Sequence, residues 1–298
     1  MALAVSVHDD LTRQALEYPA KDPAGRLQAS RHRLLVLADA VIASSHSSRM
    51  DAVGWGGVDP DKVFVVHQPF DDPEPPRDEP LRLRAEPVRG IDGAFGSISF
   101  ALQRQFLLAA ASPSSSMHNE VLVRAFASID PAVRAGRKLL LASRRDHASG
   151  MAQLKEAITS LGMQDQVLVA TGVSEESMKH LYRSCLITLV GGVEAGSVQA
   201  ALEAAAAGSG IVVADHDAFL ELVPQPDARF YPMAVDSTAS MLRRCLIDTE
   251  FCAARKAETA EALAGYSAAG TAAALRDAYK FAAASRPRRA FPARAAAR

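Results

Sequence analysis

The sequence predicts an α/β fold in which short parallel strands alternate with helices. Short apolar runs recur along the chain, and most of them are followed by a segment with the apolar spacing of a helix. Glycine marks some of the helix ends, as at Gly162 after the amphipathic stretch Met151–Leu161. Alternation of this kind is typical of parallel sheets covered by helices on both faces.

The first block of elements precedes a linker at Asp71–Pro80. Its prolines lack an amide donor and its charges keep it solvated, so we expect no regular structure there. The elements expected before it are strands at Ala2–Val7, Ala40–Ala43 and Val63–Val66, and helices at Gly25–Leu37 and Arg49–Val53.

A second block follows the linker, and its last part, Ser237–Lys280, is expected to be mostly helical. The tail from residue 285 is rich in arginine and is expected to be disordered. The domains expected are therefore 1–80, 81–284 and the tail 285–298. The strands expected in the second block are Phe106–Ala111, Lys138–Ala142, Val167–Ala170, Cys185–Val190 and Ile211–Ala214, and the helices are Asn119–Ile129, Met151–Leu161, Glu175–Arg183 and Gln199–Ala207.

Composition narrows the class of protein. The 298 residues suffice for two α/β domains, and 49% hydrophobic with 22% charged residues is ordinary for a soluble globular protein. A net charge of −1 gives no general attraction to nucleic acid. Three cysteines without metal-ligand spacing favour reduced thiols, and no apolar run reaches the length of a membrane span. We therefore expect a cytoplasmic protein without a structural metal.

The most informative stretch for function is Val193–Gly208, which reads as a turn and a helix before a buried strand. Glycine and serine at the turn leave backbone N–H groups at the helix start, where an anion such as a phosphate is favoured. Glu203, further along the helix, is the residue type that holds a ribose diol through paired hydrogen bonds. This pattern indicates a nucleotide-sugar site.

Three segments, in order, resemble the retaining glycosyltransferases of the GT-B fold (family 4, also called group 1). The first is ADAVIASSHSSR at Ala38–Arg49, with the strand VFVVHQPFDD after it, and the second is MHNEVLVRAF at Met117–Phe126. The third runs from LGMQDQVLVATGVSEESMKHLYRSC at Leu161–Cys185 into GGVEAGSVQAALEAAAAGSGIVVAD. The order and separation of the segments make the resemblance fairly specific.

The resemblance implies two Rossmann-like domains, the N-terminal one incomplete, and transfer of a hexose from a nucleoside-diphosphate sugar. It suggests mannose as the hexose and a glycan or lipid-linked acceptor in cell-surface polysaccharide synthesis, at most peripheral to the inner membrane face. Neither a metal nor another cofactor is implied, because amide groups and cationic side chains stabilise the leaving diphosphate. Nucleic acid is not an expected partner.

Glu203 matches the second glutamate of the family's paired-glutamate element. Read alone, it fits a solvent-facing residue of an alanine-rich helix better, and only the context of the resemblance favours ribose binding. The first position of the pair is open, because the family spaces the two glutamates by eight residues whereas Glu194 lies nine before Glu203. Ala195 fills the position without a gap, and Glu194 fills it only if the turn carries a one-residue bulge.

The donor phosphates are expected between two helix starts. Gly196, Ser197 and Val198 stand where the family has G-F-G, so their amides can face donor oxygens. Met117 stands where the family has a lysine, and a thioether supplies no positive charge. The side chains that could compensate are His118, Arg144 and Arg145, with a solvated surface pair as the alternative for the two arginines.

Two further groups complete the expected site. His8 ends the first apolar run and resembles the family's histidine near the donor sugar, with an ordinary turn histidine as the alternative. Thr171, Gly172 and Val173 resemble the loop whose backbone meets the nucleobase.

The front of the chain raises a second interpretation. In the family, further strands precede the one expected at Ala2–Val7, so this strand should have an unpaired edge. A fragment, a pared-down domain or a protein partner covering the edge would each account for it. With Met117, this favours the alternative of a weak or inactive nucleotide-binding subunit.

Overall fold

The computed structural model describes residues 2–7, 32–70, 106–110, 116–144, 151–192 and 195–285. The expected linker at Asp71–Pro80 and the tail from residue 286 lie outside these ranges. Contacts between Cα atoms divide the chain into two compact units. The first contains Met1–Pro69 with Ala268–Arg298, and the second contains Phe70–Ser267.

The first unit is built on a parallel sheet in the order β1-β2-β3. Asp39 fixes the start of β1, because its carboxylate accepts a hydrogen bond from the Leu3 N–H and its own N–H donates to the Leu3 carbonyl, both at 2.8 Å. The strands are β1 (Ala4–Val7), β2 (Ala40–Ala43) and β3 (Val63–Val65), and the helices are 32–37, α3 (His46–Gly54) and α10 (Ala268–Ala284).

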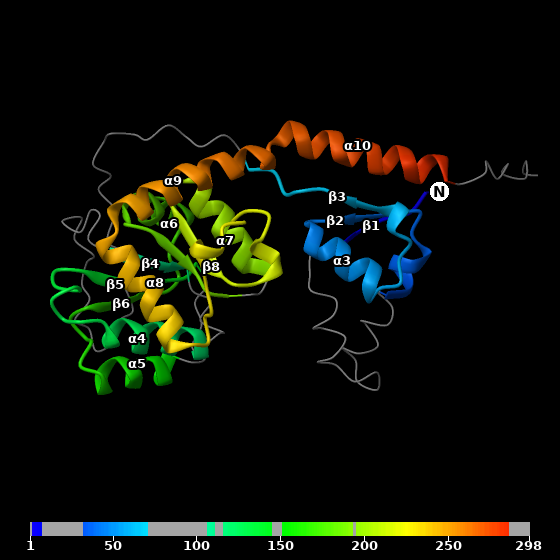
Figure 1. The fold of residues 1–298 in the computed structure, drawn as a ribbon. Helices are drawn as coiled ribbons and strands as arrows, with labels where there is room; N and C mark the ends of the chain where they lie inside the picture. Colours follow the sequence, from blue (N-terminus) through cyan, green and yellow to red (C-terminus); the bar gives the residue numbers. More distant parts are fainter. Residues whose placement is uncertain are drawn as a thin grey trace, which may run out of the picture. The chain divides into compact units, whose positions relative to one another are not determined.

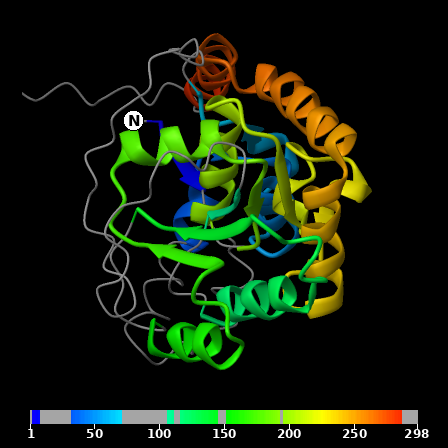
Figure 2. The ribbon, with the colours of Figure 1, turned by 90° about the vertical axis from the view of Figure 1, so that its left-hand side faces the viewer.

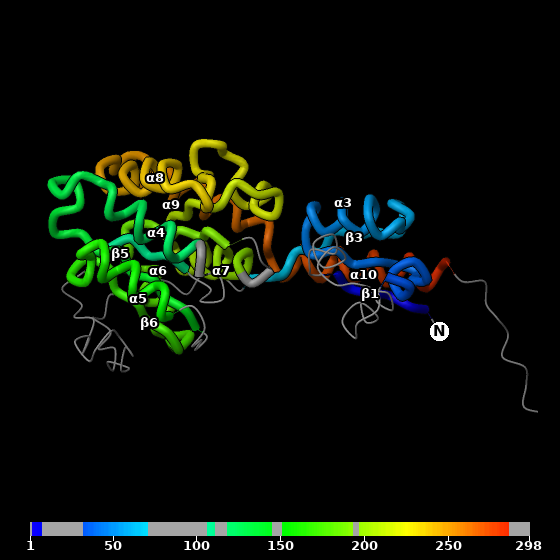
Figure 3. Tube along the Cα trace, turned by 90° about the horizontal axis from the view of Figure 1, so that it is seen from below, coloured from blue at the N-terminus to red at the C-terminus, as the bar shows by residue number. Residues whose placement is uncertain are grey.

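Pleating gives this sheet two apolar faces. Val41 and Ala43 pack with Ala52 of α3, whereas Ile42 points the other way and packs with Ala278 of α10. The rings of Phe64 and Phe281 lie 5.2 Å apart on that second face. In Figure 3, α10 runs along the strands on the side away from α3. Helix α10 thus belongs to the first unit and covers a face of its sheet that would otherwise be exposed.

Gly56, just after α3, allows the chain to pass close to the helix. A Cβ atom at this position would lie 2.4 Å from the Ala52 carbonyl oxygen, a backbone atom that cannot rotate away. We therefore expect Gly56→Ala to lower the free energy of unfolding of the first unit by about 1–3 kcal/mol. Gly54→Ala is the control, because nothing lies within 4 Å of the added methyl group. Equal urea midpoints for the two variants would contradict this prediction.

The second unit holds a parallel sheet of the order β6-β5-β4-β7-β8-β9. All neighbouring pairs are parallel, which confirms the predicted α/β class. The sequence did not predict the short strand at the end of this order, Arg229–Phe230. The strands are β4 (Phe106–Ala110), β5 (Lys138–Ala142), β6 (Val167–Ala170), β7 (Thr188–Val190), β8 (Ile211–Ala214) and β9 (Arg229–Phe230).

Helices cover both faces of this sheet (Figures 1 and 2). On one face α4 packs against α5 and α8, and on the other α7 packs against α6 and α9. Local signals fix several ends: Ser174 caps α6 through the Ser177 N–H, and Gly162 ends α5 with a φ of +65°. The helices are α4 (Ser116–Ser128), α5 (Met151–Ser160), α6 (Glu175–Ser184), α7 (Ala195–Ala206), α8 (Val235–Ile247) and α9 (Thr249–Leu263).

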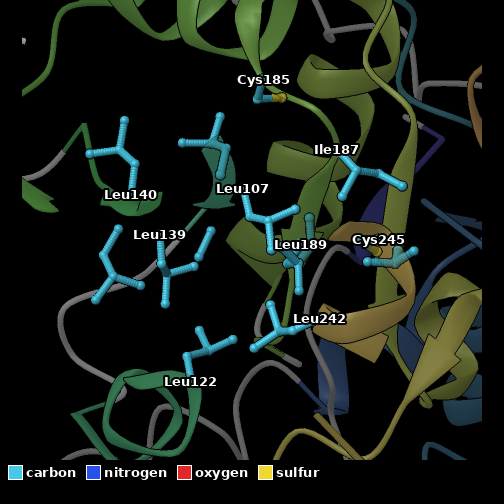
Figure 4. Packing of buried hydrophobic residues seen from close by; sticks show 14 of the residues in the cluster. Leu107, Leu122, Leu139, Leu140, Cys185, Ile187, Leu189, Leu242 and Cys245 are labelled. Atoms are coloured by element: carbon cyan, nitrogen blue, oxygen red, sulfur yellow. The ribbon is translucent and has the colours of Figure 1, made fainter. Parts of the chain in front are cut away.

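The core of the second unit is mostly aliphatic. Figure 4 shows Leu107 and Leu139 of the strands facing Leu122 of α4, with Leu242 of α8 alongside. These leucines are between 0% and 5% exposed, so the sheet is a rigid base for the loops at its ends. Within the described ranges, no helix combines the length and the apolar character that crossing a membrane requires.

Candidate functional site

The candidate site lies where the winding of the second sheet reverses. The chain passes outward from β4 through β5 to β6 and then returns to β7, on the other side of β4. In open α/β sheets, ligands bind outside the carboxyl ends of the strands at such a switch point. The two helices that follow these central strands, α4 and α7, begin there (Figure 1).

The start of α7 is earlier than the sequence predicts. The helix begins at Ala195 rather than Gln199, so Gly196, Ser197 and Val198 lie in its first turn instead of in a preceding turn. Small residues are tolerated there, because the first amides of a helix need no partner within it. Those amides and the helix dipole favour an anion. The side chain of Val198 packs against the core of the unit.

The loop from β7 approaches this first turn closely. Ser197 is buried, and a Cβ atom at Gly192 would lie 2.2 Å from its Oγ atom and 3.3 Å from its Cβ atom. At the neighbouring Gly191 the nearest atoms would be 3.7 Å away, an ordinary contact. An alanine at position 192 would therefore force the Ser197 hydroxyl to rotate and would still press on the Ser197 Cβ atom.

We expect Gly192→Ala to lower the free energy of unfolding of the second unit by about 1–2 kcal/mol. Adding Ser197→Ala should recover most of the loss, since it removes the 2.2 Å contact. Gly191→Ala is the matched control, and urea unfolding is the measurement. A cost as large for Gly191→Ala as for Gly192→Ala would refute this account of the loop.

Glu203 lies two helical turns into α7 and is held by two side chains. Its Oε1 atom accepts hydrogen bonds from Gln199 Nε2 and from an Arg144 nitrogen, each at 3.1 Å. The side chain is 21% exposed, and no described residue donates to Oε2. Burial, and next the charge of Glu203, raise the pKa of Tyr182, so that hydroxyl stays protonated beside the carboxylate. The described residues thus hold one carboxylate oxygen and donate no hydrogen bond to the other.

Arg144, directly after β5, links two helices through carboxylates. Besides Glu203, it contacts Glu175 of α6 at 3.4 Å. Glu175 also pairs with Lys179 at 3.1 Å, and its pKa is lowered by the hydrogen bond from Lys179 and then by the charges of Lys179 and Arg144. These groups are largely exposed, so the pairs orient the side chains and contribute little stability.

The loop after β6 lies against the same segment. Gly172 has a φ of +64°, a left-handed conformation that favours glycine. The Val173 N–H donates to the Ser143 carbonyl at 3.0 Å, next to Arg144. This hydrogen bond holds Val173 beside the segment that carries Arg144.

The remaining expected residues are only partly described. His118 is half-buried in the first turn of α4 and is followed by the buried Asn119. Among the described residues, no three His, Cys, Asp or Glu side chains are grouped to hold a metal ion. His8, Arg145 and Glu194 lie outside the described ranges, so their expected roles stay predictions.

The sequence-based prediction missed three contributors to this geometry. The sequence could have indicated Gln199, because it lies four residues before Glu203 on the same helix face. It could not have indicated Gly192 or Glu175, because their contacts join segments that only the fold brings together.

Comparison with known proteins identifies the fold. No protein-family model matches the sequence, and no curated protein matches it either. Among solved structures, HepE of Anabaena in complex with UDP and glucose superposes with a TM-score of 0.70 at 18% identity, over 94% of this chain and 71% of that one.

Two further structures agree with this. Sucrose-phosphate synthase from Thermosynechococcus elongatus gives a TM-score of 0.69 at 15% identity, over 95% of this chain and 68% of that one. A glycosyltransferase from Rickettsia africae gives a TM-score of 0.64 at 13% identity, over 93% of this chain and 70% of that one. The chain therefore has the fold of the GT-B glycosyltransferases, as its sequence predicts.

Proposed function

We propose that this protein is a glycosyltransferase that moves a hexose from a nucleoside-diphosphate sugar to an acceptor hydroxyl group. The observation that carries the proposal is the Glu203 carboxylate, whose Oε1 atom is held by two side chains and whose Oε2 atom receives no hydrogen bond from a described residue, on the helix that begins at the switch point of a GT-B fold. HepE, which has this fold, was crystallised with UDP-glucose, the donor class that the proposal requires.

The proposed donor contacts follow from the chemistry of each group. The ribose hydroxyls donate to the Glu203 carboxylate, which Gln199 and Arg144 hold in place. The diphosphate accepts from the first amides of α7, including those of Gly196, Ser197 and Val198. The positive charge of Arg144, with the His118 side chain beside it in the proposal, offsets the negative charge that develops on the leaving group.

In the reaction, the bond between the anomeric carbon and the diphosphate oxygen breaks as the acceptor oxygen forms a new bond to that carbon. The diphosphate leaves with the electron pair, and the acceptor hydroxyl passes its proton to the departing diphosphate oxygen. In the proposal, His8 and Glu194 face the sugar, Arg145 adds charge, Thr171 to Val173 meet the base, and configuration is retained. No metal or other cofactor enters this scheme.

The proposed setting is cell-surface polysaccharide synthesis, with mannose as the hexose and a glycan or lipid-linked acceptor. We place the protein in the cytoplasm, in peripheral contact with the inner membrane face. The resemblance of the three sequence segments supports this setting.

One residue favours a second function, that of a nucleotide-binding subunit without turnover. Met117 replaces a lysine of the family, and loss of one such group could remove roughly 3 kcal/mol of transition-state stabilisation. In this alternative, a catalytic partner covers the edge of the first sheet at β1, which ends the order β1-β2-β3 of the described strands.

Two measurements on the full chain distinguish the transferase from the nucleotide-binding subunit. One is the release of nucleoside diphosphate from UDP-hexoses and GDP-hexoses, and the other is titration with UDP and GDP. The proposal expects both binding and slow release by the isolated chain. Binding without release in any acceptor or partner mixture would leave only the subunit. Absence of both would end both proposals.

A further inference from the structure

Two cysteines meet at the corner between α8 and α9. Cys245 lies in the last turn of α8 and Cys252 in the first turn of α9. The residue between the helices, Asp248, donates its N–H to the Arg244 carbonyl at 2.9 Å and caps α9 by accepting from the Phe251 N–H at 2.8 Å. These bonds close the corner tightly, so the position of each cysteine relative to the other is fixed.

The two cysteine residues lie side by side. The Cys252 thiol donates to the Cys245 carbonyl at 3.3 Å, and each side chain influences the pKa of the other. Cys245 is 2% exposed and belongs to the hydrophobic core, where Figure 4 shows it near Ile187 and Leu242. Cys252 is half-buried. Solvent can therefore reach the Cys252 side chain, whereas Cys245 is buried.

We propose that Cys245 and Cys252 are a thiol modification site that closes to an intrachain disulfide when a small disulfide such as glutathione disulfide reacts with it. The Cys252 thiolate attacks one sulfur of the oxidant, the oxidant's S–S bond breaks, and glutathione leaves as a thiolate. Cys245 then loses its proton and its sulfur attacks Cys252 Sγ, releasing a second glutathione thiolate. Two protein thiols are oxidised and one glutathione disulfide is reduced to two thiols.

The electrostatic surroundings agree with this order of attack. The hydrogen bond from Cys245 lowers the pKa of Cys252, against burial and the charge of Asp248, which raise it. The same hydrogen bond, followed by burial, raises the pKa of Cys245. The positive charge of Arg244, whose guanidinium lies 3.8 Å from the centre of the Phe251 ring, favours both thiolates. The accessible thiol is thus the first nucleophile.

Cys185 is the internal control. It is buried, its thiol contacts Thr188 and Ser209 at 3.4 Å each, and burial raises its pKa. Among the described residues, the hydrogen-bond partners of its thiol are Tyr182, Thr188 and Ser209, none of them a cysteine. It should remain a thiol under conditions that oxidise the pair.

The test uses the folded full chain in glutathione buffers of increasing oxidised fraction, with free thiols then alkylated and the chain digested with trypsin. Cleavage after Arg244 and Arg255 places both cysteines in the single peptide Cys245–Arg255. We expect this peptide to become two hydrogen atoms lighter and resistant to alkylation, while Cys185 is alkylated throughout. The same measurement on Cys245→Ser, in which the second step is impossible, should show a lasting glutathione adduct on Cys252.

Three results would overturn the proposal. They are a glutathione adduct that persists on Cys252 in the unmodified chain, a disulfide between two chains through Cys252, and full alkylation of both thiols at every glutathione ratio. None of these readouts depends on a nucleotide or on catalytic activity. Because the first measurement needs no variant, poor folding of Cys245→Ser would not obscure the outcome.

Discussion

Glu203→Ala should weaken the binding of nucleoside diphosphate to the full chain by roughly 30- to 900-fold, or about 2–4 kcal/mol. The substitution removes a carboxylate whose Oε1 is held by Gln199 and Arg144 and whose Oε2 receives no hydrogen bond from a described residue. A ribose diol that donates to this carboxylate loses charge-assisted hydrogen bonds, each of which contributes more than a neutral one. Isothermal titration with UDP and GDP measures the effect.

The loss should not come from unfolding. Alanine is the best helix former, and the ion pair that disappears is partly exposed, so the free energy of unfolding should change by less than about 1 kcal/mol. Glu261→Ala makes the same chemical change at an exposed position of α9 and serves as the control. Equal affinities for the two variants would remove Glu203 from the donor site.

Phe126→Ala should lower the free energy of unfolding of the second unit by about 3–5 kcal/mol. Phe126 lies on α4, is 0% exposed and belongs to the core that α4 shares with the strands. Removing the ring leaves a cavity that the packed leucines around it cannot fill without moving. Urea unfolding followed by circular dichroism measures the change.

Tyr231→Ala is the matched control for this aromatic truncation. Tyr231 follows β9, and its side chain is 63% exposed. Its truncation should cost less than about 1 kcal/mol, since most of the ring is already in water. A cost for Phe126→Ala as small as for Tyr231→Ala would mean that α4 is not packed on the sheet as described.

The fold could be predicted from local patterns because most of its elements are encoded locally. The strands Val167–Ala170 and Ile211–Ala214 are apolar runs and form as expected, and Gly162 ends a helix as its position predicts. The position of α10 could not be predicted in this way. Its small apolar residues suit many surfaces, and only the exposed face of the first sheet determines where they pack.

For the candidate site, the sequence indicated residue types more than contacts. Glycine, serine and glutamate in one stretch singled out Glu203 and the segment Gly196–Val198, although that segment was expected in a turn and lies in the first turn of α7. The pairing of Arg144 with Glu203 was not, because it joins residues 59 positions apart in sequence. Such long-range pairs depend on the order of the strands, which local periodicity does not specify.

A crystal structure of the full chain with bound UDP would test the central claim most directly. We predict that the ribose hydroxyls lie within hydrogen-bond distance of the Glu203 carboxylate and that the diphosphate contacts the first amides of α7. UDP bound elsewhere on the chain, or a ribose that leaves Glu203 untouched, would contradict it.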